Sequence, residues 1–160
     1  MAHGTPPAKP DLRNPWHLLA FGFGSGLLPK APGTFGSLVG VALYLLLQGL
    51  PFSAYLGVTL LGFLAGIWIC GRTSSDLGVH DHGGIVWDEI IGYLLAMALA
   101  PEGWAWILVG FLLFRFFDIL KPWPIRWFDR QVTGGFGIMF DDLLAGLYAG
   151  VVMQIVQRGF

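Results

Sequence analysis

The sequence has little cysteine and little charge. Cys70 is its single cysteine, so no internal disulfide can form and the redox compartment stays open. Charged residues fill 12% of the 160 positions, against about 25% in ordinary soluble proteins. Such a surface is too poor in charge for a compact soluble domain. The formal net charge of −1 also provides no basic field for nucleic acid, so no nucleic-acid partner is expected.

Apolar residues dominate the chain instead. Hydrophobic residues make up 55% and aromatic residues 15% of the sequence, and the mean hydropathy is +0.67. This composition predicts an all-α, multi-span membrane bundle of about four or five short transmembrane helices, formed by a single domain over residues 15–160. The apolar stretches cover residues 35–50, 54–70, 85–100, 104–120 and 138–157.

The first 29 residues differ from the rest. Residues 1–14 are polar and rich in proline, without the apolar core of a cleaved signal, and are expected to form a disordered lead. Segment 15–29 is apolar but interrupted by glycines. It is shorter than a membrane crossing requires and is expected to form a re-entrant or interfacial helix.

The connections between the apolar stretches indicate a topology. Connections 48–51 and 100–103 are tight turns without lysine or arginine. Connections 1–34, 71–84 and 121–137 contain seven of the nine basic residues, namely Lys9, Arg13, Lys30, Arg72, Lys121, Arg126 and Arg130. The positive-inside rule therefore places the amino terminus and these long connections in the cytoplasm.

Two acid pairs follow glycine-rich turns at related positions. Residues 85–91 and 138–144 form a weak internal repeat that aligns Asp88 with Asp141 and Glu89 with Asp142. Each pair is expected in about the first turn of a membrane helix. Asp88 and Asp141 each begin a stripe of small residues at intervals of four, which allows close helix packing. Converging carboxylates favour an oxygen-ligated cation such as Mg²⁺, although each acid could instead only cap its helix.

Basic and hydroxyl side chains provide candidate phosphate donors. Segment 115–130 mixes cations with aromatic rings, and Lys121 and Arg126 could bind an anionic headgroup or only anchor the loop at the interface. Lys30, Thr34 and Ser37 surround the glycine-containing start of the first clear apolar stretch, where backbone N–H groups favour anions. A plain helix cap by Thr34 or Ser37 explains the same pattern.

A polar turn precedes the first acid pair. It contains Asp81 and His82, and either side chain could transfer a proton. A histidine in a loop more often has no such role. Cys70 is expected to pack in the core, because the arginine that a thiol phosphatase loop needs six positions later is replaced by Asp76.

Five ordered motifs resemble the phosphatidylglycerophosphatase A family of bacterial lipid phosphatases. They extend over about residues 17–150 and read GFGSG at 22–26, PGTFGS at 32–37, DHGGIVWDE at 81–89, FDILKPWPI at 117–125 and GGFGIMFDD at 134–142. The resemblance implies an all-helical fold in the bacterial inner membrane, dependence on Mg²⁺, and a phospholipid substrate with a terminal phosphomonoester.

Residues and resemblance together predict hydrolysis of phosphatidylglycerol phosphate to phosphatidylglycerol and phosphate. The candidate catalytic residues are Asp88, Asp141, Asp81 and His82. The candidate metal ligands are Asp88, Glu89, Asp118, Asp141 and Asp142, and the candidate phosphate-binding residues are Lys30, Thr34, Ser37, Lys121 and Arg126. The alternatives are a small ion or solute transporter that uses the acids, and a lipid-binding scaffold. The oligomeric state stays open.

Overall fold

The structure, a computed structural model, describes residues 6–159 and is all-helical within that range. The predicted all-α class is therefore confirmed. The elements are α1 (Pro15–Ala20), the 3₁₀ helix η1 (Ser25–Leu27), α2 (Pro32–Leu47), α3 (Phe52–Leu77), α4 (Trp87–Ala98), α5 (Trp104–Leu120), α6 (Ile125–Gln131) and α7 (Gly134–Gly159).

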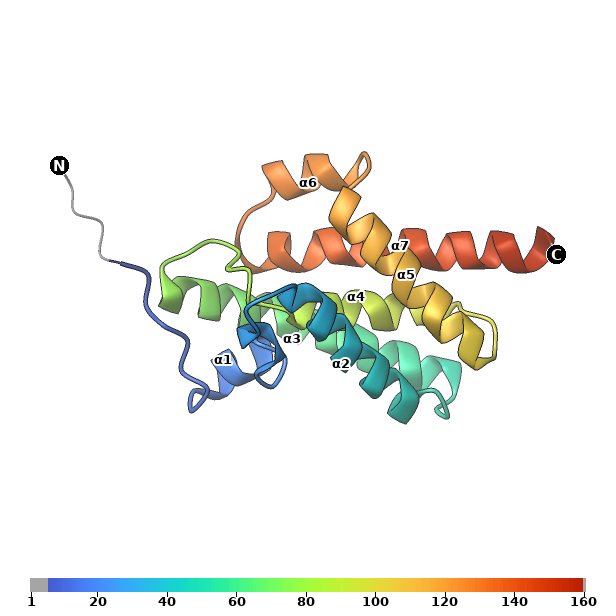
Figure 1. The fold of residues 1–160 in the computed structure, drawn as a ribbon, viewed down its shortest axis with the longest axis horizontal. Helices are drawn as coiled ribbons and strands as arrows, with labels where there is room; N and C mark the ends of the chain where they lie inside the picture. Colours follow the sequence, from blue (N-terminus) through green and yellow to red (C-terminus); the bar gives the residue numbers. More distant parts are fainter. Residues whose placement is uncertain (1–5, 160) are drawn as a thin grey trace.

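Five helices, α2, α3, α4, α5 and α7, form a bundle and run alternately in opposite directions along it (Figure 1). The tight connections 48–51 and 99–103 lie at one end of the bundle. The long connections that contain most of the basic residues lie toward the other end. Helix α4 packs against α2, α3, α5 and α7, and its Ile90, Ile91 and Leu94 are buried.

Three predicted boundaries were wrong. Helix α3 continues to Leu77, since Thr73, Ser74 and Leu77 are buried, and it ends where Gly78 adopts a left-handed φ of +68°. Helix α7 begins at Gly134 rather than after the glycines, and segment 121–137 contains α6. Within 15–29 the chain forms α1, a glycine-containing turn and η1 instead of one helix.

The lead before α1 is only partly described. Residues 1–5 of the predicted disordered segment 1–14 lie outside the described residues. In the remaining part, the Ala8 N–H donates to the Leu77 carbonyl oxygen at 3.2 Å. The Asn14 side chain caps α1 by accepting from the Trp16 N–H at 3.0 Å. These contacts join the lead to α1 and to the end of α3.

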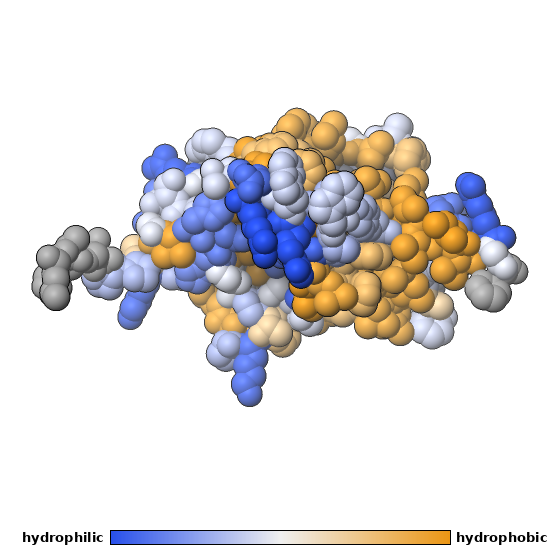
Figure 2. All heavy atoms as spheres, turned by 90° about the horizontal axis from the view of Figure 1, so that it is seen from above, coloured by the Kyte–Doolittle hydropathy of each residue, from blue (hydrophilic) through white to orange (hydrophobic). Residues whose placement is uncertain are grey.

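Helices α3 and α7 are each 26 residues long and apolar enough to cross a membrane. Helix α2 has 16 residues and α4 only 12, so the predicted count of four or five spans is not established by helix length. Large apolar side chains are nevertheless exposed, including Leu46, Leu61 and Ile155. Figure 2 shows a hydrophobic band between the hydrophilic half that holds the long connections and the C-terminal tip. An apolar surface of this extent suits contact with lipid.

Candidate functional site

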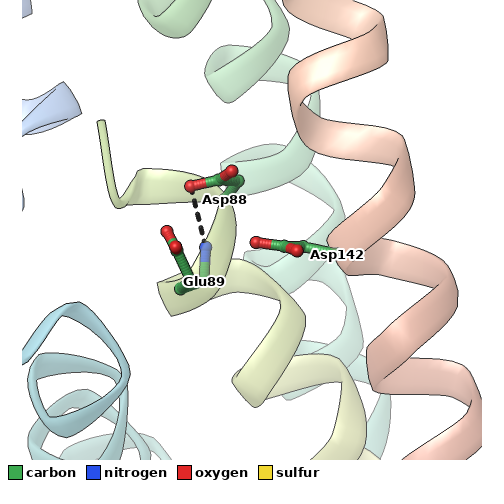
Figure 3. Close-up of side chains that lie close together, drawn as sticks. All are labelled: Asp88, Glu89 and Asp142. Atoms are coloured by element: carbon green, nitrogen blue, oxygen red, sulfur yellow. Dashed lines mark hydrogen bonds between the residues drawn. The ribbon is translucent and has the colours of Figure 1, made fainter. Parts of the chain in front are cut away.

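Three carboxylates converge between α4 and α7. Asp88 and Glu89 lie in the first turn of α4, as predicted, and Asp142 projects toward them from α7 (Figure 3). One oxygen from each of the three side chains lies within 4.8 Å of the others. Asp88 and Asp142 are only 6% and 1% exposed, so water does little to screen their mutual repulsion.

The local backbone fixes one oxygen of the first acid in each pair. Asp88 Oδ1 accepts from the Glu89 N–H, and Asp141 Oδ1 accepts from the Asp142 N–H, both at 3.0 Å. Glu89 Oε2 and Asp142 Oδ2 are buried and have no hydrogen-bond partner within the described residues 6–159. Buried carboxylate oxygens without partners are costly. Asp88, Glu89 and Asp142 therefore fit a divalent cation of the kind that prefers oxygen ligands.

Two cations of the protein pair with the neighbouring acids. Lys121 Nζ forms an ion pair with Asp141 and lies 3.7 Å from Asp129 Oδ1. Burial lowers the pKa of Lys121, but the Asp141 and Asp142 carboxylates outweigh it and raise the pKa overall. Arg115 forms an ion pair with Asp118 one turn along α5. Asp141 and Asp118 thus each form an ion pair, whereas Asp88, Glu89 and Asp142 form none within residues 6–159.

The three converging carboxylates, together with Asp118, Asp141 and Lys121, line a pocket of about 140 Å³, here called the acidic pocket, that also contains Asp81 and His82. Asp81 adopts a left-handed φ of +50° in the turn before α4. Burial of its carboxyl group raises its pKa, although Lys121 and His80 lower it. His82 Nδ1 accepts from the Gly84 N–H at 2.9 Å, so the proton of the neutral ring lies on Nε2.

Some predicted phosphate-binding residues do not line this pocket. Lys121 lines it, whereas Lys30, Thr34 and Ser37 do not. Ser37 is buried and donates its hydroxyl to the Gly33 carbonyl oxygen at 2.9 Å within α2. Arg126 instead lines an adjacent pocket that also includes Lys121.

The two acid pairs are not placed as the internal repeat predicts. The expectation that Asp141 and Asp142 lie in about the first turn of their helix was wrong, because α7 begins at Gly134. Gly135 and Gly137 pack against the carbonyl oxygens of Ile67 and Val132, where a Cβ atom would not fit, and they therefore belong to the packed helix.

Sequence reasoning assigned no site role to Arg115. Its side chain is 15% exposed, and its Nη1 atom would lie 3.0 Å from a Cβ atom added to Gly33. Glu89 Oε1 would lie 2.8 Å from the same Cβ atom. Gly33 thus lets the start of α2 approach Arg115 and Glu89. An arginine inside an apolar stretch, three residues before an aspartate, was the available signal.

A family model described as phosphatidylglycerophosphatase A matches residues 18–157, which include all the residues of the acidic pocket. The chain belongs to this family. The resemblance inferred from the five motifs is thereby confirmed, and so is the prediction of a phosphatase enzyme.

Two curated relatives are named phosphatidylglycerophosphatase A. The Escherichia coli protein is 51% identical over 146 residues, covering 91% of this chain and 85% of the relative. The Haemophilus influenzae protein is 53% identical over 159 residues, covering 98% of each. A Bacteroides thetaiotaomicron relative, 38% identical over 88% of this chain and 92% of its own, is provisionally named a phosphatidylinositol-3-phosphatase. No solved structure matches the chain.

Proposed function

We propose that this member of the phosphatidylglycerophosphatase A family hydrolyses the terminal phosphomonoester of phosphatidylglycerol phosphate in a reaction that depends on Mg²⁺. The products are phosphatidylglycerol and inorganic phosphate. The observation that carries the proposal is the convergence of Asp88, Glu89 and Asp142 beside Lys121 in one pocket. Its volume of about 140 Å³ is below the roughly 300 Å³ of a typical small-molecule site. This size suits a phosphate group better than a whole headgroup.

Asp88, Glu89 and Asp142 would hold the Mg²⁺ ion, because one oxygen of each lies within 4.8 Å of the others. Bound Mg²⁺ would polarise a phosphate oxygen and favour a nucleophilic water. Asp141 and Asp118 were also candidate ligands. Their ion pairs with Lys121 and Arg115 favour a role in orienting these cations instead.

The remaining pocket residues can perform the proton and charge transfers of hydrolysis. The Lys121 ammonium group would offset the negative charge on the phosphoryl oxygens. Water adds its oxygen to phosphorus as the bond from phosphorus to the glycerol oxygen breaks. Asp81 or His82 would accept the proton that the attacking water loses, and the departing glycerol oxygen would receive a proton from the same two residues, since both line the pocket.

We place the enzyme in the bacterial inner membrane, with the pocket facing the cytoplasm. The basic long connections toward the pocket end of the bundle support this orientation. Helices α2, α3, α4, α5 and α7 would be embedded, with the short α4 enclosed by the others. The transporter alternative requires acids along a pathway at mid-membrane depth. The acidic side chains of the pocket lie together toward one end of the bundle, which favours the enzyme.

Phosphate release by detergent-purified protein tests the proposal. We expect release from phosphatidylglycerol phosphate with Mg²⁺, none with EDTA, and a loss of at least about 100-fold in Asp88→Asn. Glu102→Gln, at the other end of the bundle, should retain activity. Phosphatidylinositol 3-phosphate is the comparison substrate, because one relative is named for it. A folded wild type that releases no phosphate with Mg²⁺, or a fully active Asp88→Asn variant, would refute the proposal.

A further inference from the structure

A second pocket, here called the cationic pocket, lies beside the acidic pocket and shares Lys121 with it. Its volume is about 420 Å³, and Trp123, Arg126, Trp127 and Arg130 contribute to its lining. Lys121 also lines the acidic pocket, where it pairs with Asp141. The Lys121 side chain therefore stands between a site for one phosphate group and a larger site with two further cations.

These two cations have no acidic partner. Arg126 and Arg130 are exposed, and no carboxylate lies within 4 Å of either guanidinium group among residues 6–159. Arg126 Nη2 donates to the Leu120 carbonyl oxygen at 3.1 Å, which orients the guanidinium group at the end of α5. Two arginines of this kind offer bidentate donors to a phosphate.

An apolar recess of about 360 Å³ continues on the other side of the two tryptophans. Trp123 and Trp127 line both this recess and the cationic pocket, and Pro124 and Phe128 complete the recess. The Tyr148 hydroxyl donates to the Trp123 carbonyl oxygen at 3.2 Å and ties this segment to α7. Figure 2, which views the face that carries α6, shows strongly hydrophilic side chains beside paler ones and next to the hydrophobic band.

The three sites thus follow one another in a fixed order. The acidic pocket meets the cationic pocket at Lys121, and the cationic pocket meets the apolar recess at Trp123 and Trp127. Phosphatidylglycerol phosphate, the proposed substrate, has the same order of chemistry. Its terminal phosphate is followed by glycerol, then by an internal phosphodiester, and then by the acylated glycerol.

We propose that Arg126 and Arg130 bind the internal phosphodiester of the lipid substrate and that the Trp123–Trp127 recess receives the adjoining acylated glycerol. This inference rests on the proposed function for the identity of the substrate. It makes the cationic pocket the determinant that selects lipids with two phosphates over lipids with a single terminal phosphate. Phosphatidic acid has only the terminal phosphate and would gain nothing from the two arginines.

Binding without catalysis provides the first test. Phosphatidylglycerol retains the phosphodiester but has no terminal phosphate, so dihexanoyl phosphatidylglycerol can be titrated calorimetrically into detergent-solubilised protein with EDTA. We expect Arg126→Gln/Arg130→Gln to weaken binding about tenfold or more. Arg158→Gln, an exposed arginine in the last turn of α7, should bind as the wild type does. Dihexanoylglycerol, which lacks phosphate, should bind to the wild type and to the double variant with equal affinity.

Two outcomes would overturn the inference in this assay. Equal affinity of the wild type and the double variant for dihexanoyl phosphatidylglycerol would show that the arginines do not bind the phosphodiester. Displacement of the lipid by an equal concentration of inorganic phosphate would show a site for free phosphate rather than for a lipid headgroup.

Kinetics provide the second test. With Mg²⁺, the double variant should lose about tenfold in kcat/KM on phosphatidylglycerol phosphate, mostly through KM, and should keep wild-type kcat/KM on phosphatidic acid. An equal loss on both lipids would overturn the inference, because it would indicate general attraction to an anionic surface. A wild type without phosphatase activity would refute the proposed function alone, since the binding assay in EDTA still decides the role of the arginines.

Discussion

Gly146 of α7 packs directly against the carbonyl oxygen of Gly92 in α4. A Cβ atom at Gly146 would lie 2.2 Å from that oxygen, so only glycine fits there. Asp88 and Asp142 each lie four residues before one of these glycines, and α4 and α7 run in the same direction. The glycine contact therefore brings the carboxylates of Asp88 and Asp142 together at the pocket.

Gly146→Ala should separate α4 from α7 and weaken the fold. We expect a loss of about 1–3 kcal/mol in stability, as for other overpacked cores, and reduced phosphatase activity because Asp142 moves away from Asp88. Thermal unfolding in detergent measures the first effect. Gly57→Ala in α3 is the matched control, since nothing lies within 4 Å of a Cβ atom there. If Gly146→Ala unfolded at the wild-type temperature with full activity, the close contact would not be needed.

Mg²⁺ should stabilise the wild type much more than Asp142→Asn. A ligand at 100 times its dissociation constant adds about 2.7 kcal/mol to the free energy of unfolding. Loss of Asp142 removes one of the three converging carboxylates, so the response to Mg²⁺ should fall sharply. Without Mg²⁺, Asp142→Asn should be at least as stable as the wild type, because a buried repulsion is relieved. Melting curves with Mg²⁺ and with EDTA test this prediction, with Glu102→Gln as the control. If Mg²⁺ stabilised Asp142→Asn as much as the wild type, Asp142 would be excluded as a ligand.

Arg115→Met should destabilise the protein by about 3 kcal/mol, since it leaves Asp118 without its cation in a largely buried position. The double variant Arg115→Met/Asp118→Asn should recover part of this loss. Arg72→Met is the matched control, because Arg72 pairs with Asp76 and its side chain is 56% exposed. Exposed ion pairs contribute only about 0.2–1 kcal/mol to stability. Equal losses in Arg115→Met and Arg72→Met would contradict the structural role of the buried pair.

Lys121→Gln should reduce kcat/KM by about 100-fold or more. It should also lower the free energy of unfolding, because buried Asp141 loses its cation. The variant loses the positive charge between the acidic and cationic pockets. Glutamine would occupy the same left-handed backbone position, φ +46°, so the backbone strain should not change. Lys9→Gln, at an exposed position in the lead, controls for a general loss of positive charge. An active Lys121→Gln variant would remove Lys121 from the phosphate site.

Much of the site could be predicted from local features. Composition predicted helices, the glycines before Asp88 predicted acids in a first helical turn, and the distribution of lysine and arginine separated the two ends of the bundle. The sequence named both Asp141 and Asp142 as candidate ligands beside Asp88, but local features could not choose between them. The stripes of small residues that begin at Asp88 and Asp141 suggested that these two acids face each other. An α-helix rotates by about 100° per residue, however, so neighbouring side chains face different sides of the helix. Adjacent acids on α7 therefore point in different directions, and packing selects between them.

The sequence by itself determined that this chain is helical and poor in charge, with cations in its long connections and acid pairs after glycine-rich turns, because composition and spacing are local properties. Only the tertiary structure decided which charges are compensated. It pairs Lys121 with Asp141 and Arg115 with Asp118, and it leaves Asp88, Glu89 and Asp142 facing one another. These contacts depend on how closely α4 and α7 approach and on the rotation of each helix about its axis, which no single stretch of sequence specifies.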